Sequence, residues 1–140
     1  TDLLAEAKLS PELRNEALYY RAKAYTKQKA DKKAMEDYRE LAKDTRNPYG
    51  AEAKYQVAQS LYDAKEYAAA EKELLNYIEQ STPHAYWLAR SFVLLSDVYH
   101  ATGKDLDARQ YLLSLQQNYQ GNDDIESMIE SRLSKLKVEN

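Results

Sequence analysis

The residues best suited to catalysis in this chain are Ser96, Asp97 and His100, which lie within five consecutive positions. On a helix, Ser96 and His100 would stand one turn apart and could touch, as a nucleophile and its base must. A hydrolytic triad also needs a third group that orients the base, and donors that stabilise an oxyanion. One helix supplies neither, because Asp97 is one step round the helix from Ser96. We therefore interpret Ser96 as a packing residue and expect that the protein is not an enzyme.

Metal and phosphate chemistry lack the residues that they need. The two histidines, His84 and His100, are 16 positions apart, and the sequence has no His-x3-His, His-Glu-x2-His or Asp-rich loop. Cysteine is absent, which excludes disulfides, thiol catalysis and cysteine-based zinc sites. The sequence also has no glycine-rich loop that could cradle a phosphate. We expect no metal and no cofactor.

Composition restricts the class of partner. A chain of 140 residues is long enough for one domain that buries about 68% of its unfolded surface. Charged residues make up 31% and no apolar run approaches the ~18 residues of a membrane span, so we expect no direct membrane insertion. The net charge is −3, the pI is 5.5 and the mean hydropathy is −0.81. Nucleic-acid-binding domains usually have a pI above ~9, so we expect no nucleic-acid partner. Because the chain begins with Thr1 rather than Met, we interpret it as a fragment of a longer chain.

Proline motifs and apolar spacing predict an all-helical chain. A capping residue precedes a proline, which suits the first position of a helix, in Ser10–Pro11, Asn47–Pro48 and Thr82–Pro83. Near the end, Gly121 is expected to stop one helix and Asn122 to cap the next, with Asp123 and Asp124 in its first turn. Between these points apolar residues recur with helical spacing. The expected helices are 11–28, 32–45, 48–64, 67–80, 83–101, 105–118 and 123–137, and residues 1–8 are interpreted as the end of an earlier helix.

The chain contains an internal repeat. Four sets of residues keep the same offsets of 36 and then 38 positions, which a coincidence of composition would not produce. The sets are Ala22, Ala58 and Ser96; Tyr25, Leu61 and Tyr99; Ala34, Ala70 and Ala108; and Tyr38, Leu74 and Leu112.

This arrangement resembles the tetratricopeptide repeat, a helix pair with the pattern large-x2-L-G-x2-Y, then A-x3-F, then Pro. The first copy is Leu18-x2-Arg21-Ala22-x2-Tyr25, Ala34-x3-Tyr38, Pro48. The second is Lys54-x2-Val57-Ala58-x2-Leu61, Ala70-x3-Leu74, Pro83, and the third is Phe92-x2-Leu95-Ser96-x2-Tyr99, Ala108-x3-Leu112, without a closing Pro. The resemblance covers residues 15–119, and Arg21 and Lys54 depart from the pattern.

The resemblance implies a right-handed α-solenoid of about three helix pairs in a single domain. Its parts would be a remnant of a preceding helix (1–10), three repeats (11–46, 47–81 and 82–120) and a capping helix (121–140). Small residues such as Ala58 and Ala70 would let the two helices of a pair approach closely, while Leu61, Tyr67 and Leu74 fill the space around them. The last helix should cover the third pair. Its apolar side carries Ile125, Met128, Ile129, Leu133 and Leu136.

The repeats are longer than the usual 34 residues. Pro48 lies 10 positions before Ala58, whereas Pro83 lies 13 before Ser96, so the third pair should begin almost one turn early. Slightly long units with an opening proline are similar to those of bacterial envelope proteins, such as outer-membrane assembly lipoproteins and periplasmic cell-division factors. This similarity favours the bacterial periplasm or cell envelope over the cytoplasm, although no residue fixes the compartment.

In this family the first helix of each pair lines a concave groove that binds proteins. Tyrosine gives a large contact area at low entropy cost, which suits such a surface, although Tyr19 and Tyr55 could instead stack on one another as ridge residues. A family clamp for C-terminal carboxylates would match positions 19, 23, 56, 90 and 94, of which only Arg90 has the required chemistry, so we do not expect that clamp. The expected groove residues are Tyr19, Lys23, Tyr55, Gln59, Tyr62, Arg90, Val93, Asp97 and His100.

We therefore expect a non-catalytic scaffold that binds a protein or peptide partner in this groove. The alternative is a purely architectural role as the terminal segment of a longer solenoid in a cell-envelope assembly. Leu4 stands seven positions before Pro11, as Leu41 stands seven before Pro48, which supports the alternative. A small-molecule pocket has no positive feature in the sequence.

Overall fold

The protein is all-helical. The structure, a computed structural model, describes residues 10–80, 83–121 and 123–136, and these form seven α-helices without a strand. None of these helices has both the length and the apolar character that crossing a lipid bilayer requires. The expected helix within residues 1–8 lies outside the described residues. The helices are α2 (Pro11–Lys27), α3 (Asp31–Leu41), α4 (Pro48–Asp63), α5 (Tyr67–Glu79), α6 (Ala85–Ala101), α7 (Asp105–Asn118) and α8 (Ile125–Lys135).

Two of the three proline motifs start helices as predicted. The Ser10 hydroxyl accepts a hydrogen bond from the Leu13 amide at 3.2 Å, and α2 follows. The Asn47 side chain accepts one from the Gly50 amide at 2.8 Å, and α4 follows. Gly50 has a second role, because a β-carbon there would collide with the Asp44 carbonyl. Its lack of a side chain lets the end of the first hairpin lie against the start of α4.

The early start expected for the third pair is wrong. The helix α6 begins at Ala85, eleven positions before Ser96, and α4 begins at Pro48, ten positions before Ala58, so the difference is one residue rather than almost a turn. The extra length of the longer repeat lies mainly at the end of α5. That helix ends nine residues after Ala70, whereas α3 ends seven residues after the equivalent Ala34. Thr82, the expected cap, lies outside the described residues.

Two further boundaries differ from the expectation. The helix α3 ends at Leu41 rather than near residue 45, because a short turn follows it. Asp123 and Asp124 precede α8 instead of forming its first turn, and the Asp123 carboxylate accepts a hydrogen bond from the Ile125 amide at 3.0 Å. This bond satisfies the first amide of the helix. Asn122, the expected cap, lies outside the described residues.

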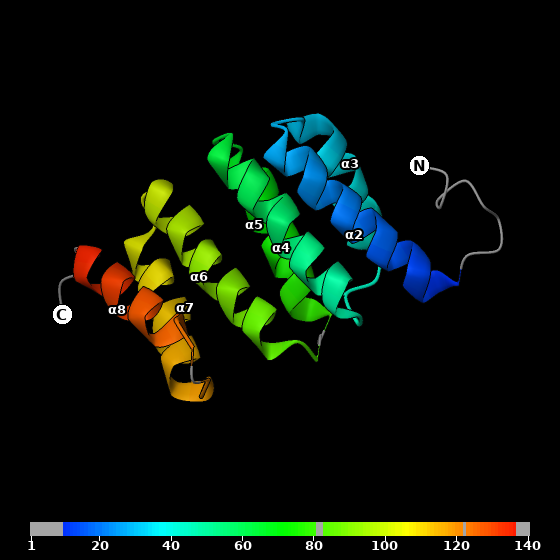
Figure 1. The fold of residues 1–140 in the computed structure, drawn as a ribbon. Coiled ribbons are helices and arrows are strands. Elements are labelled where there is room, and N and C mark those ends of the chain that lie inside the picture. Colours follow the sequence, from blue (N-terminus) through cyan, green and yellow to red (C-terminus); the bar gives the residue numbers. More distant parts are fainter. Residues whose placement is uncertain (1–9, 81–82, 122, 137–140) are drawn as a thin grey trace.

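The helices form three consecutive hairpins and a final single helix. Each helix packs on its neighbours in sequence, and α2 also packs on α4, α4 on α6, and α6 on α8. Figure 1 shows the hairpins side by side in chain order, with α2 and α3 at one end and α8 at the other. Every helix therefore contacts only elements near it in the chain.

The turns inside the hairpins repeat with the same offsets as the sequence. The residues at the turn, Lys29, Lys65 and Gly103, have positive φ angles of 61°, 63° and 79°, and they are spaced by 36 and then 38 positions. After each one, the next amide bonds back to a carbonyl of the preceding helix, for example Ala30 N to Tyr25 O at 2.8 Å. This is the Schellman arrangement that ends a helix. The backbone thus repeats together with the side-chain pattern.

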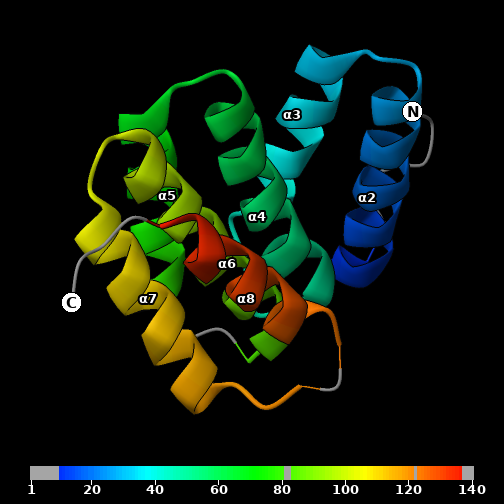
Figure 2. The same cartoon turned by 90° about the vertical axis from the view of Figure 1, so that its left-hand side faces the viewer.

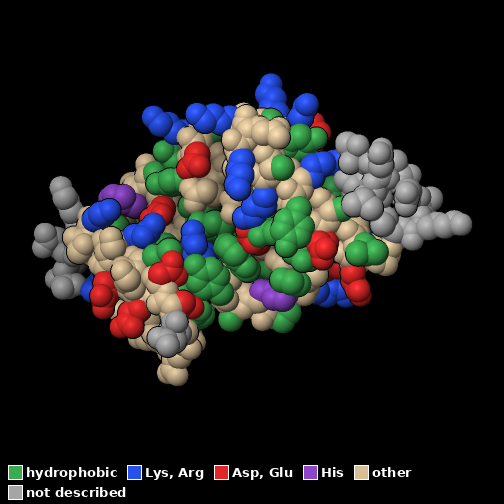
Figure 3. Space-filling model, in the orientation of Figure 1, with side chains coloured by type: hydrophobic (Ala, Val, Ile, Leu, Met, Phe, Trp, Pro, Cys, Tyr) green, Lys and Arg blue, Asp and Glu red, His purple; other side chains and the backbone are tan. Residues whose placement is uncertain are grey.

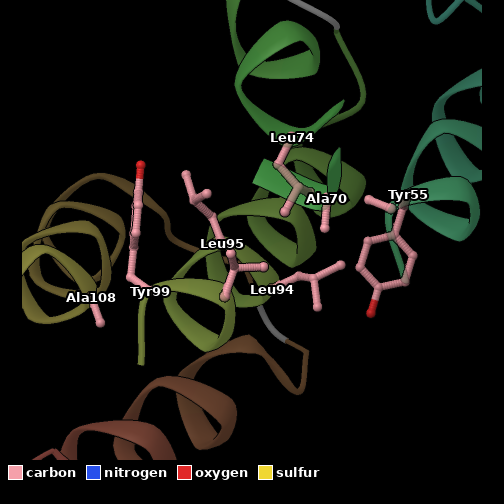
Figure 4. Packing of buried hydrophobic residues seen from close by; sticks show 9 residues of the cluster. Tyr55, Ala70, Leu74, Leu94, Leu95, Tyr99 and Ala108 are labelled. Atoms are coloured by element: carbon pink, nitrogen blue, oxygen red, sulfur yellow. The ribbon is translucent and has the colours of Figure 1, made fainter. Parts of the chain in front are cut away.

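The small residues of the repeat lie at the centre of the helix contacts. Each of Ala22, Ala34, Ala58, Ala70, Ser96 and Ala108 is at most 3% exposed. The large residues that follow in the second helices, Tyr38, Leu74 and Leu112, are also buried. In Figure 4, Ala70 and Leu74 of α5 lie beside Leu94 of α6, which faces the ring of Tyr55 in α4. The core is a row of such clusters rather than one central core.

The two departures from the repeat pattern are matched by acids in the second helix of the same hairpin. The Arg21 guanidinium forms two hydrogen bonds with the Asp37 carboxylate, at 2.8 and 2.6 Å. The Lys54 ammonium lies 3.1 Å from the Glu73 carboxylate. Asp37 and Glu73 occupy equivalent positions, 36 residues apart, directly before Tyr38 and Leu74. The third hairpin has an aromatic pair at the positions of Lys54 and Glu73, formed by Phe92 and Tyr111, whose ring centroids are 5.8 Å apart.

The final helix covers the last hairpin with the side predicted for it. Ile125 and Ile129 are buried against α6 and α7, and Met128, Leu133 and Leu136 pack around them. Figure 2 shows α8 lying over the end of the molecule in front of α6. Apolar surface of α6 and α7 that would otherwise face water is therefore buried.

The fully buried Ala70 tests the packing register. Replacing Ala70 with Leu should overpack the α4–α5 contact and lower the free energy of unfolding by about 1–3 kcal/mol. Ala69→Leu is the matched control, since Ala69 is the next residue of the same helix and is exposed. Chemical denaturation of both variants measures the difference. Equal stability of the two variants would contradict the register.

The left-handed turn residues give a second prediction. Lys65 is exposed and has a φ of 63°, a conformation that costs a residue with a β-carbon roughly 1–2 kcal/mol and glycine nothing. Lys65→Gly should therefore raise the free energy of unfolding by up to about 1 kcal/mol. Lys65→Ala removes the same charge and keeps the β-carbon, so it should give no such gain. A glycine variant no more stable than the alanine variant would mean that the turn differs from the structure.

Candidate functional site

Most of the expected groove residues lie on one face of the molecule, which we call the front face. It is formed by α2, α4, α6 and α8, the helices that pack on one another along the row of hairpins. Figure 3 shows hydrophobic side chains gathered in the middle of this face with basic side chains among them. The contacts between successive helices on this face decide which residues a partner could reach.

The first contact joins α2 to α4 through Glu52. The Tyr19 hydroxyl donates to one oxygen of this carboxylate at 2.9 Å, and the Lys23 ammonium donates to the other at 2.7 Å. Burial lowers the pKa of Lys23, but its hydrogen bond and charge attraction to Glu52 outweigh that effect and raise it. The Tyr19 ring contacts Tyr49, at a centroid distance of 4.8 Å. Both predicted residues of α2 are thus held by α4.

The second contact joins α4 to α6 through Tyr55 and Arg90. The Arg90 guanidinium donates to the Tyr55 hydroxyl at 2.9 Å and lies over its ring, 4.8 Å from the centroid. The Tyr55 ring also contacts the ring of Trp87 in a tilted arrangement, at a centroid distance of 5.6 Å, and its hydroxyl donates a hydrogen bond to Gln59 at 2.8 Å. Tyr55 is only 6% exposed, so the expectation that it stands exposed in a groove is wrong. Its ring partner is Trp87, and the ring partners of Tyr19 are Tyr20 and Tyr49, so the alternative of a Tyr19–Tyr55 stack is not supported either.

The third contact joins α6 to α8 through Asp97 and Arg132. The guanidinium holds both oxygens of the carboxylate, with distances of 3.1 and 3.2 Å for the shorter pair of bonds. Its geometry is the planar, two-pronged one that arginine forms with carboxylates. The predicted site residue Asp97 is therefore neutralised by a residue 35 positions away that the sequence did not single out.

Val93 is buried as well, which corrects its place in the predicted groove. It is 3% exposed and packs with Ile125 and Ile129 of α8. Tyr19, Tyr55 and Val93 occupy the same repeat position, three residues before the small residue. In each case the next helix of the front face lies against this position. The position therefore serves the contact between units, and its side chains are not free to act as anchors for a partner in the way that the groove prediction assumed.

The remaining predicted residues surround a hollow between α4, α6 and α8. Its volume is about 380 Å³. Four of the predicted groove residues line it, two from α4 and two from α6. The end of α8 lines the other side with two basic side chains and one leucine. We call it the α4–α6–α8 hollow; it is lined by Gln59, Tyr62, Ser96, Asp97, His100, Arg132, Lys135 and Leu136.

The hollow combines an aromatic ring with mostly compensated charge. Tyr62 is half-buried, and both burial and the nearby Asp97 carboxylate raise its pKa, so this phenol is neutral at physiological pH. Asp97 is paired with Arg132, and the His100 ring nitrogen Nδ1 lies 2.8 Å from the Asp105 carboxylate. The Lys135 ammonium adds a positive charge that no described carboxylate pairs with. The hollow thus offers an apolar wall and a net positive charge.

The serine and histidine considered for catalysis do not engage one another. The Ser96 hydroxyl donates to the Val93 carbonyl at 2.6 Å, within its own helix, and Ser96 is 2% exposed. The His100 ring faces Asp105 instead. Within residues 10–80, 83–121 and 123–136, no group of three His, Asp or Glu side chains is arranged to hold a metal ion.

Comparison of the chain with protein-family models, with curated proteins and with solved structures gave no match.

Sequence reasoning missed Glu52, Arg132, Lys135 and Leu136. All four contact or line the front face, yet each resembles an ordinary residue of an amphipathic helix in the sequence. One signal was present for Glu52 and Arg132. Each carries a charge opposite to that of an expected groove residue on the neighbouring unit, Lys23 or Asp97, at a separation of 29 or 35 residues.

Proposed function

We propose that the protein is a non-catalytic scaffold, a tetratricopeptide-like right-handed α-solenoid that binds a partner protein on its front face. The single observation that carries the proposal is the α4–α6–α8 hollow, into which Tyr62 and three other predicted residues open. The hollow sets the Tyr62 ring and the Leu136 side chain among polar and charged groups. An aromatic residue surrounded by polar ones is typical of the anchor points of protein–protein contacts.

The repetition of the hairpins supports the solenoid. The small packing residues, the left-handed turn residues and the contacts between successive front helices all recur with the repeat. Stacked units of this kind present an extended surface that follows the row of first helices. A partner segment lying along this surface would reach the hollow at one end.

The contacts on the front face make the proposal more specific. Tyr55, Tyr19 and Val93 hold neighbouring helices together, so their loss would damage the fold rather than a free binding surface. Within the hollow, the side chains open to a partner are Gln59, Tyr62, His100 and Lys135. Tyr62 provides the largest contact area among them and is the expected anchor point.

A second candidate, the architectural role, is favoured by one face of α2. Leu13 and Tyr20 are 55% and 60% exposed. Their repeat equivalents in α6 are Trp87 and Leu94, which pack on the hairpin before them. A further helical unit, in the same chain or in another molecule, would cover α2 in the same way. In this candidate the hollow plays no part in binding.

Site-specific photo-cross-linking separates the two candidates. A photoreactive residue at position 62 should cross-link a partner in cells of the source organism, whereas one at the exposed Lys72 of α5 should not. Tyr62→Ala should then weaken the affinity of the purified partner by about 2 kcal/mol, because a buried aromatic contact is lost. Tyr20→Ala is the matched control and should leave the affinity unchanged. A partner that responds to Tyr20→Ala and ignores Tyr62→Ala would refute the front-face proposal and support the architectural one.

A further inference from the structure

Arg90 is a half-buried cation of the front face, and its environment differs from that of the two other arginines on the contacts described above. Arg21 and Arg132 are each held by two bonds to a carboxylate, Asp37 or Asp97. No carboxylate of the described residues lies within ion-pair distance of Arg90. The structure surrounds it with aromatic rings instead.

Three rings form this surrounding. The Arg90 guanidinium carbon lies 4.8 Å from the centroid of Tyr55 and 5.8 Å from those of Tyr86 and Trp87. Two guanidinium nitrogens donate to phenol oxygens, Nη1 to Tyr86 at 3.0 Å and Nη2 to Tyr55 at 2.9 Å. A carboxylate is linked to Arg90 only through a phenol, because the Tyr86 hydroxyl donates in turn to Asp124 at 3.0 Å.

The two hydrogen bonds to phenols leave most of the N–H donors of Arg90 without a protein acceptor among the described residues. A guanidinium has five N–H donors, and these two bonds use two of them. Burial lowers the pKa of Arg90, and the hydrogen bonds and attraction from Tyr86 and Tyr55 outweigh that effect and raise it, so the group is positively charged. A half-buried charge that faces only neutral phenols is worse solvated than in water, and an added carboxylate would gain both an ion pair and hydrogen bonds.

Arg90 lies close to the α4–α6–α8 hollow, on one of the helices that line it. Arg90 and Asp97 lie seven residues, or about two turns, apart along α6, which is about 10 Å. The hydrogen bonds from Arg90 to Tyr55 and from Tyr55 to Gln59 lead directly to the wall of the hollow. An extended chain covers about 10 Å in roughly three residues.

We propose that Arg90, held in place by Tyr55, Tyr86 and Trp87, binds the carboxylate of an Asp or Glu side chain in the partner segment. This inference rests on the proposed function. The acid lies about three residues from the apolar side chain that fills the α4–α6–α8 hollow, and the partner segment is extended. The site differs from the family clamp for C-terminal carboxylates, since it uses one arginine and an aromatic surface. The planar guanidinium gives the site its selectivity for a carboxylate, because its paired N–H donors match the two carboxylate oxygens and lysine has no such pair.

The test uses peptides selected from a displayed random 12-residue library against the whole chain. Selected peptides should be enriched in an acid about three residues from an apolar residue. Replacing that Glu or Asp with its amide should weaken binding to the parent at least ten-fold. The same change should have no effect on binding to Arg90→Gln, because the partner of the carboxylate is already gone. Arg90→Lys should also lose at least ten-fold, and Arg109→Gln on α7 serves as the arginine control.

The outcomes separate this inference from the proposed function. Peptides that lose affinity with Tyr62→Ala and bind Arg90→Gln as tightly as the parent overturn the inference and leave the proposed function intact. Peptides that respond to neither variant, or a library that yields no binder, overturn both. If Arg90→Gln lowers the melting temperature, the peptide variant provides the test instead. The acid-to-amide change in the peptide is then measured on the parent protein, and an unchanged affinity overturns the inference.

Discussion

The close approach of the two helices in each hairpin is the constraint on which the rest of the structure depends. It requires a small, fully buried residue at one position of each helix, as at Ala58 and Ala70. Once the helices are this close, the large residues after them, such as Leu74, fill the space on either side and present apolar surface to the next hairpin. No hairpin buries that surface alone, so the units must stack. The turn residues with positive φ, Lys29, Lys65 and Gly103, keep the two helices of each pair in the same relation.

Stacking in turn decides what the front face can do. The contacts Lys23–Glu52, Tyr55–Arg90 and Asp97–Arg132 each join one front helix to the next. These side chains are the type that a binding surface would use, and most of them are already engaged within the fold. What remains open is the hollow beside Tyr62, together with the donors of Arg90 that no described acid accepts. The same residues therefore set both the shape of the stack and the place where we propose that a partner binds.

Much of the fold could be predicted from the sequence because it depends on local rules. The caps at Ser10 and Asn47 and the apolar side of α8 follow from residue type and helical spacing. The burial of Tyr55 and Val93 could not be predicted in the same way. Spacing tells which side of a helix a residue is on, but the next hairpin decides whether that side is covered. The hollow was missed for a related reason, since α8 builds one of its walls with Arg132 and Lys135, and its placement over α6 is a tertiary contact.

The most direct test of the central claim is the hydrogen-exchange footprint of a bound partner or selected peptide on the whole chain. If the front face beside the hollow is the binding surface, binding should slow amide exchange in the later turns of α4 and α6 and in α8, and leave α3, α5 and α7 unchanged. Protection confined to α3, α5 and α7, or to α2 alone, would contradict the account.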